Sequence, residues 1–266
     1  MKTYIKSLFT LALLGMATSC TKLDVDIKSQ YTSFPNSEAA AEAVSADVYN
    51  AYRGAMGREH WMVQTLSSDE AVAVAMGADY YDGGIYRQLH LHNWTADHGM
   101  LAGMWNSAMT GITSCNKVLA LFGDDESNNA APIRAMRAYY YFILMDNFGA
   151  VPIITKLVDQ QPDRAPRTEV CKFIESELLA VIDKLPNNVD GGTYGKSTQY
   201  MAAALLAKLY LNWAVYQSAD VANYSPSQTN EKLQSAVEMC DLIIKSGKFN
   251  LSDKFMAKFR PDNGPQ

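Results

Sequence analysis

The chain has 266 residues, of which 23 are basic and 28 acidic, giving a net charge of −5. An acidic chain without a basic patch is a poor partner for nucleic acid, whereas its charge does not exclude the binding of neutral ligands. Four cysteines are present. They form no C-x-x-C pair, and the three beyond Cys20 are widely spaced, so zinc or redox chemistry is unsupported and no cofactor is expected.

Residues 1–19 are typical of a signal peptide, because Lys2 and Lys6 precede an apolar run that ends in small residues. The run is too short for a spanning helix, which needs about 20 apolar residues. The sequence A-T-S-C predicts a lipoprotein signal, in which Cys20 is acylated, for example with palmitate, and anchors the chain to a membrane. The alternative is an ordinary secretory peptide cleaved near Ala17, with Cys20 as a spare thiol.

Residues 20–35 are polar and predict a tether and an extended lead-in, followed by a helical domain over 36–266. Asn36 is expected to cap a first helix that runs to about Tyr52 and ends at Gly54 and Gly57. From Trp61 to Asn93 the helical period is lost. A long irregular stretch in a compact domain is usually functional or disordered, and its many aromatic residues argue against disorder.

Apolar periodicity and cap signals predict five further helices. The first of these is capped by Asp97 and continues to Phe122, and the second has Pro132 in its first turn and Gly149 behind it. The third runs from Thr168 to Pro186, the fourth is capped by Ser197, and the fifth runs from Asn230 to Gly247. Their starts lie roughly 30 to 40 residues apart, which favours a mainly α fold of antiparallel hairpins resembling tetratricopeptide repeats. Cys115 and Cys240 lie on apolar sides of these helices, so we expect both to be buried.

Several stretches then resemble the SusD/RagB family in the expected order. They are the lipoprotein start, "LSSDE" at 66–70, "MWNSAMTGITSCNKVL" at 104–119, "IRAMRAYYYFILMDNFGAVPI" at 133–153 and "GKSTQYMAAALLAKLYLNWAVY" at 195–216. The run from Arg134 to Pro152 is the most specific, because its helix ends in Phe-Gly-Ala-Val-Pro. Its stripe of Arg137, Tyr140, Tyr141, Leu144 and Phe148 is expected to be a packing face that identifies the family without binding its ligand.

The resemblance implies a SusD-like fold with long irregular loops and a lipid-anchored protein of the outer membrane of Bacteroidetes-type bacteria, facing the cell surface. It implies binding of a nutrient, most often an oligosaccharide, and delivery to a SusC-like TonB-dependent transporter. Asp24 and Asp26, close behind Cys20, are compatible with export to the surface. Family members are considerably longer, which implies that the chain is truncated at its C-terminus.

Carbohydrate recognition needs flat aromatic platforms beside hydrogen-bonding groups, because sugars present apolar C–H faces and a rim of hydroxyls. The 77–94 segment supplies both. The predicted ligand-binding residues are Asp79, Tyr80, Tyr81, Arg87, Asn93 and Trp94. The alternative is that Tyr81, Tyr86 and Trp94 anchor a long loop onto the helices.

Other motifs favour structural interpretations. His90 and His92 could face one side of a strand as metal ligands, but no third ligand follows at a diagnostic spacing, so no metal is expected. Adjacent Asp69 and Glu70 would point in opposite directions and cannot form a glycosidase pair alone. "GTYGKST" at 192–198 lacks the spacing of a phosphate loop and is interpreted as a turn and a helix cap.

The sequence therefore favours a binding protein and not an enzyme. Two alternatives stay open: a structural lid or partner of the transporter without ligand affinity of its own, and a lipoprotein glycosidase on a helical scaffold.

Overall fold

The structure is a computed structural model that describes residues 38–122, 129–157, 162–218, 220, 222–225, 229–251 and 254–261. The predicted signal peptide, tether, lipidation residue Cys20 and cap residue Asn36 lie outside the described residues. Internal contacts divide the chain into Met1–Pro35 and Asn36–Gln266, and every described residue belongs to the second unit. No helix within the described ranges is long and apolar enough to cross a membrane.

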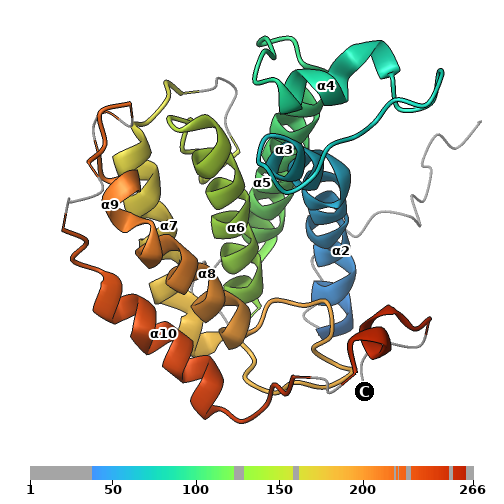
Figure 1. Ribbon diagram of the computed structural model, residues 1–266. Helices are drawn as coiled ribbons and strands as arrows, with labels where there is room; N and C mark the ends of the chain where they lie inside the picture. Colours follow the sequence, from blue (N-terminus) through green and yellow to red (C-terminus); the bar gives the residue numbers. More distant parts are fainter. Residues whose placement is uncertain are drawn as a thin grey trace, which may run out of the picture. The chain divides into compact units, whose positions relative to one another are not determined.

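The second unit is built from α-helices and short helical turns. In chain order they are α2 (Glu38–Gly54), η2 (Ala55–His60), α3 (Trp61–Leu66), η3 (Asp82–Gly84), α4 (Ile85–His90), α5 (Gly99–Phe122), α6 (Ala130–Phe148), α7 (Arg167–Val181), η4 (Ile182–Lys184), α8 (Gln199–Leu211), α9 (Trp213–Tyr216), α10 (Leu233–Lys245) and η5 (Phe255–Phe259). The long helices α2, α5, α6, α7, α8 and α10 form an array in which each packs against the next (Figure 1). This arrangement confirms the predicted mainly α fold of helical hairpins.

The α-helix α2 ends at Gly54, as predicted. The chain nevertheless stays helical through Gly57, so the predicted end of helical structure at these glycines is wrong. Gly54 keeps helical angles (φ −66°, ψ −46°), and the chain passes through the π-helical turn η2 directly into α3. A Cβ at Gly54 would lie 3.4 Å from the Ser107 Oγ atom on α5. The glycine therefore serves close packing of α2 on α5, and that packing stabilises the helix beyond it.

Helix boundaries agree elsewhere to within a few residues, but the caps differ. Thr198, not Ser197, caps α8, because its side-chain oxygen accepts a hydrogen bond from the Met201 amide (3.3 Å). The Ser197 hydroxyl instead donates to the Pro132 carbonyl (3.1 Å). Asn230 precedes α10 by three residues, and its side-chain amide donates to the Tyr210 carbonyl (2.9 Å), which ties the start of α10 to α8.

The exit from α6 follows the prediction. Gly149 ends the helix with a φ of 73°, a conformation that favours glycine. Val151 then pairs with Ala165 as an isolated bridge, so the chain leaves the helix in an extended conformation. The face of α6 that identifies the family is a packing face, as predicted. Its members Arg137, Tyr140, Tyr141 and Leu144 are buried, and Phe148 is half-buried.

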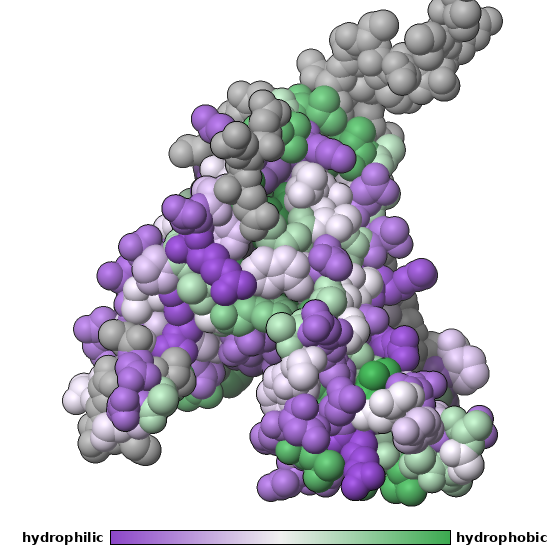
Figure 2. Space-filling model, turned by 90° about the horizontal axis from the view of Figure 1, so that it is seen from above, coloured by the Kyte–Doolittle hydropathy of each residue, from purple (hydrophilic) through white to green (hydrophobic). Residues whose placement is uncertain are grey.

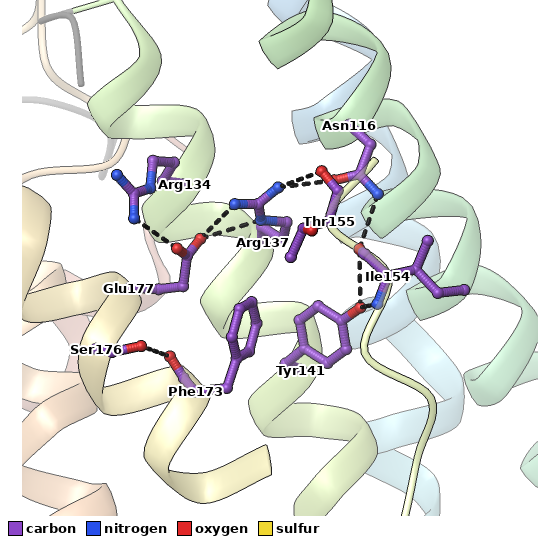
Figure 3. A network of polar contacts seen from close by, with 9 residues as sticks. All are labelled: Asn116, Arg134, Arg137, Tyr141, Ile154, Thr155, Phe173, Ser176 and Glu177. Carbon is purple, nitrogen blue, oxygen red and sulfur yellow. Dashed lines mark hydrogen bonds and ion pairs between the residues drawn. The ribbon is translucent and has the colours of Figure 1, made fainter. Parts of the chain in front are cut away.

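A buried polar network joins α5, α6, α7 and the extended exit (Figure 3). Arg137 lies at its centre and donates to Glu177 through Nε (3.1 Å) and Nη2 (2.6 Å). Its Nη1 donates to the Asn116 side chain (2.8 Å) and to the Thr155 carbonyl (3.1 Å). Arg134 donates to the other Glu177 oxygen (2.6 Å). Because the buried charges are paired and hydrogen-bonded, the network fixes one register between these elements.

The cysteine predictions have mixed outcomes. Cys115 and Cys171 are buried free thiols, and burial raises the pKa of Cys171 to about 12. Cys240 is exposed, so its predicted burial is wrong. The helix α10 carries apolar residues on two sides: one side packs on α8, and the other leaves Val237 and Ile244 exposed beside Cys240. Periodicity alone cannot tell which apolar side of such a helix is covered.

Candidate functional site

The segment between α3 and α5 carries the unusual backbone of the molecule. Among the residues that the structure describes, the non-glycine residues with a positive φ are Tyr80 (57°), Asp82 (39°) and His92 (54°). This left-handed conformation costs an ordinary residue about 1–2 kcal/mol. Strained backbone of this kind clusters at ligand-binding and active sites, where surrounding contacts hold it in place. The clustering therefore marks residues 80–92 as a functional candidate.

The short helix α4 anchors the segment. Tyr86 and Leu89 are buried, and Arg58 on η2 donates to the Tyr86 hydroxyl (3.2 Å). The buried His98 ring contacts the Ile85 carbonyl through Nε2 (3.1 Å). These contacts fix α4 against the π-helical turn and the start of α5. The packing alternative considered for Tyr86 is therefore confirmed, and a helix replaces part of the stretch that the sequence predicted to be irregular.

The remaining aromatic side chains of the segment face outward. Tyr80 and Tyr81 are 55% and 60% exposed, and Trp94 is 38% exposed. Tyr80 contacts Tyr86 with ring centroids 6.0 Å apart, and Trp94 contacts His92 at 5.3 Å. The two aromatic groups thus lie at the two ends of α4, a helix about 9 Å long. Exposed rings held by neighbouring rings are suited to stacking on a ligand.

The polar candidates lie beside these rings. Asp79, Arg87 and Asn93 are exposed, and the Asp79 backbone pairs with Met76 in an isolated bridge. Their side chains can thus offer a carboxylate, a guanidinium and an amide to a ligand. The structure therefore distributes the six predicted residues along one exposed segment without gathering them into a closed pocket.

Sequence reasoning missed the apolar surroundings of these residues. Trp61, Val72, Val74, Met76 and Leu91 are each more than half exposed. Figure 2 looks onto the end of the array that carries α3 and α4, and it shows apolar patches interrupted by hydrophilic surface. Exposed apolar side chains gathered in one region are typical of interaction sites. Trp61 could have been recognised, because it is an aromatic residue at the boundary of the irregular stretch.

The histidine pair and the acidic pair, which were interpreted as structural from the sequence, lie on the surface near α3 and α4. His90 ends α4 and His92 lies in the following turn, so the strand on which both would alternate is absent. No group of three or more potential ligands among the described residues is placed to hold a metal ion. Asp69 and Glu70 are exposed, and the Ser68 hydroxyl accepts a hydrogen bond from the Glu70 amide (3.3 Å), which is a local backbone contact.

The "GTYGKST" stretch forms a turn, as predicted. Asp190 organises it by accepting hydrogen bonds from the Gly192 amide (2.8 Å) and the Thr193 amide (3.1 Å). The Asn188 side chain, followed by these two amides, lowers the pKa of Asp190. The carboxylate therefore stays ionised and occupied with its own loop.

A pocket lies where this loop meets α2 and α6. Its volume is about 190 Å³, and its lining includes Tyr49, Tyr52, Tyr139, Lys196 and Ser197. Sequence reasoning missed it entirely. The spacing of Tyr49 and Tyr52 by three residues on one helix face was the available signal.

The structure is a helical array that carries an exposed segment rich in aromatic residues. Residues 23–211 match the sequence model of a SusD-like family described as "Starch-binding associating with outer membrane", and the chain belongs to this family. The starch-binding protein SusD of Bacteroides thetaiotaomicron is 27% identical over 129 residues, which are 48% of this chain and 21% of that protein.

Solved structures show the same fold. Surface glycan-binding protein A from Bacteroides uniformis has a TM-score of 0.68 at 20% identity, covering 85% of this chain and 50% of that one. A SusD homologue from Bacteroides thetaiotaomicron has a TM-score of 0.64 at 22% identity, covering 82% and 42%. A laminarin-binding SusD-like protein has a TM-score of 0.58 at 26% identity, covering 73% and 45%. The chain thus spans half or less of the length of these relatives.

Proposed function

We propose that this chain binds an oligosaccharide through the exposed segment 76–94 and delivers it to a SusC-like TonB-dependent transporter. The observation that carries the proposal is the clustering of strained backbone and exposed aromatic rings in this one segment. The family description and the names of the glycan-binding and laminarin-binding relatives support a carbohydrate as the ligand.

Each candidate residue has a role that fits sugar chemistry. The rings of Tyr80, Tyr81 and Trp94 stack on the apolar C–H faces of sugar rings. Asp79, Arg87 and Asn93 exchange hydrogen bonds with hydroxyl groups, with Asp79 accepting and Arg87 donating. Because the site is open, it binds internal parts of a long chain as well as its ends.

The proposed location is the cell surface, with the chain anchored in the outer membrane through the acylated Cys20. The signal sequence that ends in A-T-S-C and the family's association with the outer membrane support this location. A tethered receptor of this kind raises the concentration of its ligand near a transporter in the same membrane. The proposal is binding without catalysis, and the adjacent acids Asp69 and Glu70 cannot form a glycosidase pair alone.

Affinity electrophoresis of the full chain, purified in detergent, through gels containing soluble starch or laminarin tests this function. We expect retardation of the wild type, and about a tenfold rise in Kd for Trp94→Ala and Tyr81→Ala, which corresponds to about 1.4 kcal/mol. Tyr194→Ala is the matched control, because Tyr194 is 63% exposed but lies in the 188–196 turn.

Two other outcomes would change the assignment. Retardation that is insensitive to both site variants would place the binding site elsewhere. A folded chain that binds no polysaccharide would favour a structural partner of the transporter, and release of reducing sugar during incubation would revive the glycosidase.

A further inference from the structure

A pocket between α2, α6 and the turn before α8 lies apart from the segment 76–94. Tyr49 and Tyr52 come from α2, Tyr139 from α6, and Lys196 and Ser197 from the turn. Three segments far apart in the sequence thus meet around a volume of about 190 Å³. None of the described residues that line the pocket belongs to the segment 76–94 or to α3 and α4.

The walls of the pocket are held in place. The rings of Tyr52 and Tyr139 meet edge to face, with centroids 5.4 Å apart and planes at 68°, and form a corner. The Tyr49 hydroxyl accepts a hydrogen bond from the Ser197 amide (3.4 Å), and the Ser197 hydroxyl donates to the Pro132 carbonyl (3.1 Å). Both contacts fix the turn against the helices, so a ligand would pay little ordering cost.

The lining combines apolar faces with hydrogen-bonding groups. Met136 and Met201 complete an apolar floor and wall beside the three tyrosines. Burial, and to a smaller degree the neighbouring Tyr52 hydroxyl, raises the pKa of Tyr139, so the Tyr139 hydroxyl stays protonated. The Lys196 side chain lines the rim and is exposed. Aromatic faces beside hydroxyl and ammonium donors match the C–H faces and hydroxyls of a sugar ring.

The size of the pocket limits how much of a ligand it can hold. Pockets that enclose a drug-sized molecule measure roughly 300–1,000 Å³. A volume of about 190 Å³ is smaller and suits one ring with its substituents. We propose that this pocket is a second carbohydrate subsite that takes a single sugar residue of a glycan. The inference rests on the proposed function, and it adds a site whose described lining shares no residue with the segment 76–94.

Two separated subsites make binding depend on ligand length. A polysaccharide that reaches both sites binds with a higher apparent affinity than a disaccharide, which occupies one site at a time. The loss of either site then reduces the affinity for the polymer, whereas the affinity of the remaining site for a disaccharide is unchanged.

The test compares the wild-type full chain with Tyr52→Ala, Lys196→Ala, Trp94→Ala and the control Tyr194→Ala. Tyr194 lies in the same turn as Lys196 but does not line the pocket. The probes are soluble starch and laminarin with their disaccharides maltose and laminaribiose, measured by calorimetry. We expect a five- to tenfold weaker polymer affinity for Tyr52→Ala and for Trp94→Ala, and no change for Tyr194→Ala.

Each result decides between the two sites. Polymer binding weakened by Trp94→Ala but not by Tyr52→Ala or Lys196→Ala overturns the second subsite and leaves the proposed function intact. The reverse pattern supports the pocket and overturns the first site. A wild type that binds none of the probes overturns both. If Tyr52→Ala lowers the melting temperature strongly, Lys196→Ala and Tyr52→Phe, which remove only exposed or polar groups, decide the outcome.

Discussion

Single residues of the buried network are expected to dominate stability. Glu177 accepts hydrogen bonds from both Arg134 and Arg137, and its side chain is 7% exposed. Removing one partner of a buried ion pair leaves an uncompensated charge and costs about 3–5 kcal/mol. We therefore expect Glu177→Ala to lower the free energy of unfolding by this amount in urea denaturation.

A surface pair on the same scaffold provides the control. Asp241 and Lys245 are 2.7 Å apart, with side chains 44% and 75% exposed. Such a pair contributes about 0.3–0.5 kcal/mol. Equal losses for Asp241→Ala and Glu177→Ala would contradict the central role of the network.

His60 is expected to make the stability of the folded chain depend on pH. Desolvation lowers the pKa of His60 in the folded state, Asp146 opposes this shift to a smaller extent, and Lys208 lowers the pKa further. Its Nδ1 atom accepts from the Asn147 amide (3.4 Å), whose oxygen accepts from Gln64 (2.8 Å), so the neutral ring fits the site. The unfolded chain then binds more protons near pH 6, and stability falls as the pH drops below about 6.5.

Thermal melts between pH 7.5 and 5.5 measure this effect. We expect His60→Gln to flatten the loss of stability below pH 6.5, whereas the exposed His90→Gln leaves the slope unchanged. An unchanged slope in His60→Gln would show that another group controls the dependence.

At the scale of elements, the contact between α5 and α6 depends on Gly111. A Cβ at this position would overlap the Tyr140 ring, which is fully buried and whose hydroxyl donates to the Val48 carbonyl on α2 (2.5 Å). We expect Gly111→Ala to cost about 1–3 kcal/mol in denaturant unfolding, because the three helices must separate to admit a methyl group.

Gly103 on the same helix is the matched control. A Cβ there would meet the Glu59 side chain at 3.1 Å, and this chain can move aside. We expect Gly103→Ala to be neutral or stabilising, because alanine favours the helix. Equal destabilisation by both substitutions would show that the close approach at Tyr140 is unimportant.

The sequence predicted long helices better than short ones. The apolar period and Gly149 were sufficient for α6, since its pattern extends over several turns. The six-residue helices α3 and α4 were missed, because they are too short to show a period and depend on contacts from η2 and α5. The same limit applies to Gly54, whose role depends on Ser107 in another helix.

The candidate site was predictable as a segment but not residue by residue. The density of aromatic, glycine and acidic residues identified the region. Whether a given ring faces inward depends on partners distant in sequence: Arg58 holds Tyr86 inside, while Tyr81 stays 60% exposed. The pocket at Tyr52 and Tyr139 was missed for the same reason: the spacing of Tyr49 and Tyr52 marks one wall, but the other walls come from two separate segments.

At the scale of the whole molecule, a fixed helical array presents an exposed, strained segment at one end (Figure 1). The buried network and the α5–α6 contact keep the array rigid, so a ligand meets a preformed surface. Membership in the SusD-like family sets the context, and the proposed ligand is a carbohydrate.

Hydrogen–deuterium exchange of the full chain, with and without saturating soluble starch or laminarin, tests whether residues 76–94 bind the polysaccharide. We expect bound polysaccharide to slow exchange in peptides covering these residues, since bound sugar shields the turns around α4. Protection confined to other helices, or none despite demonstrated binding, would contradict the assignment of this segment as the binding site.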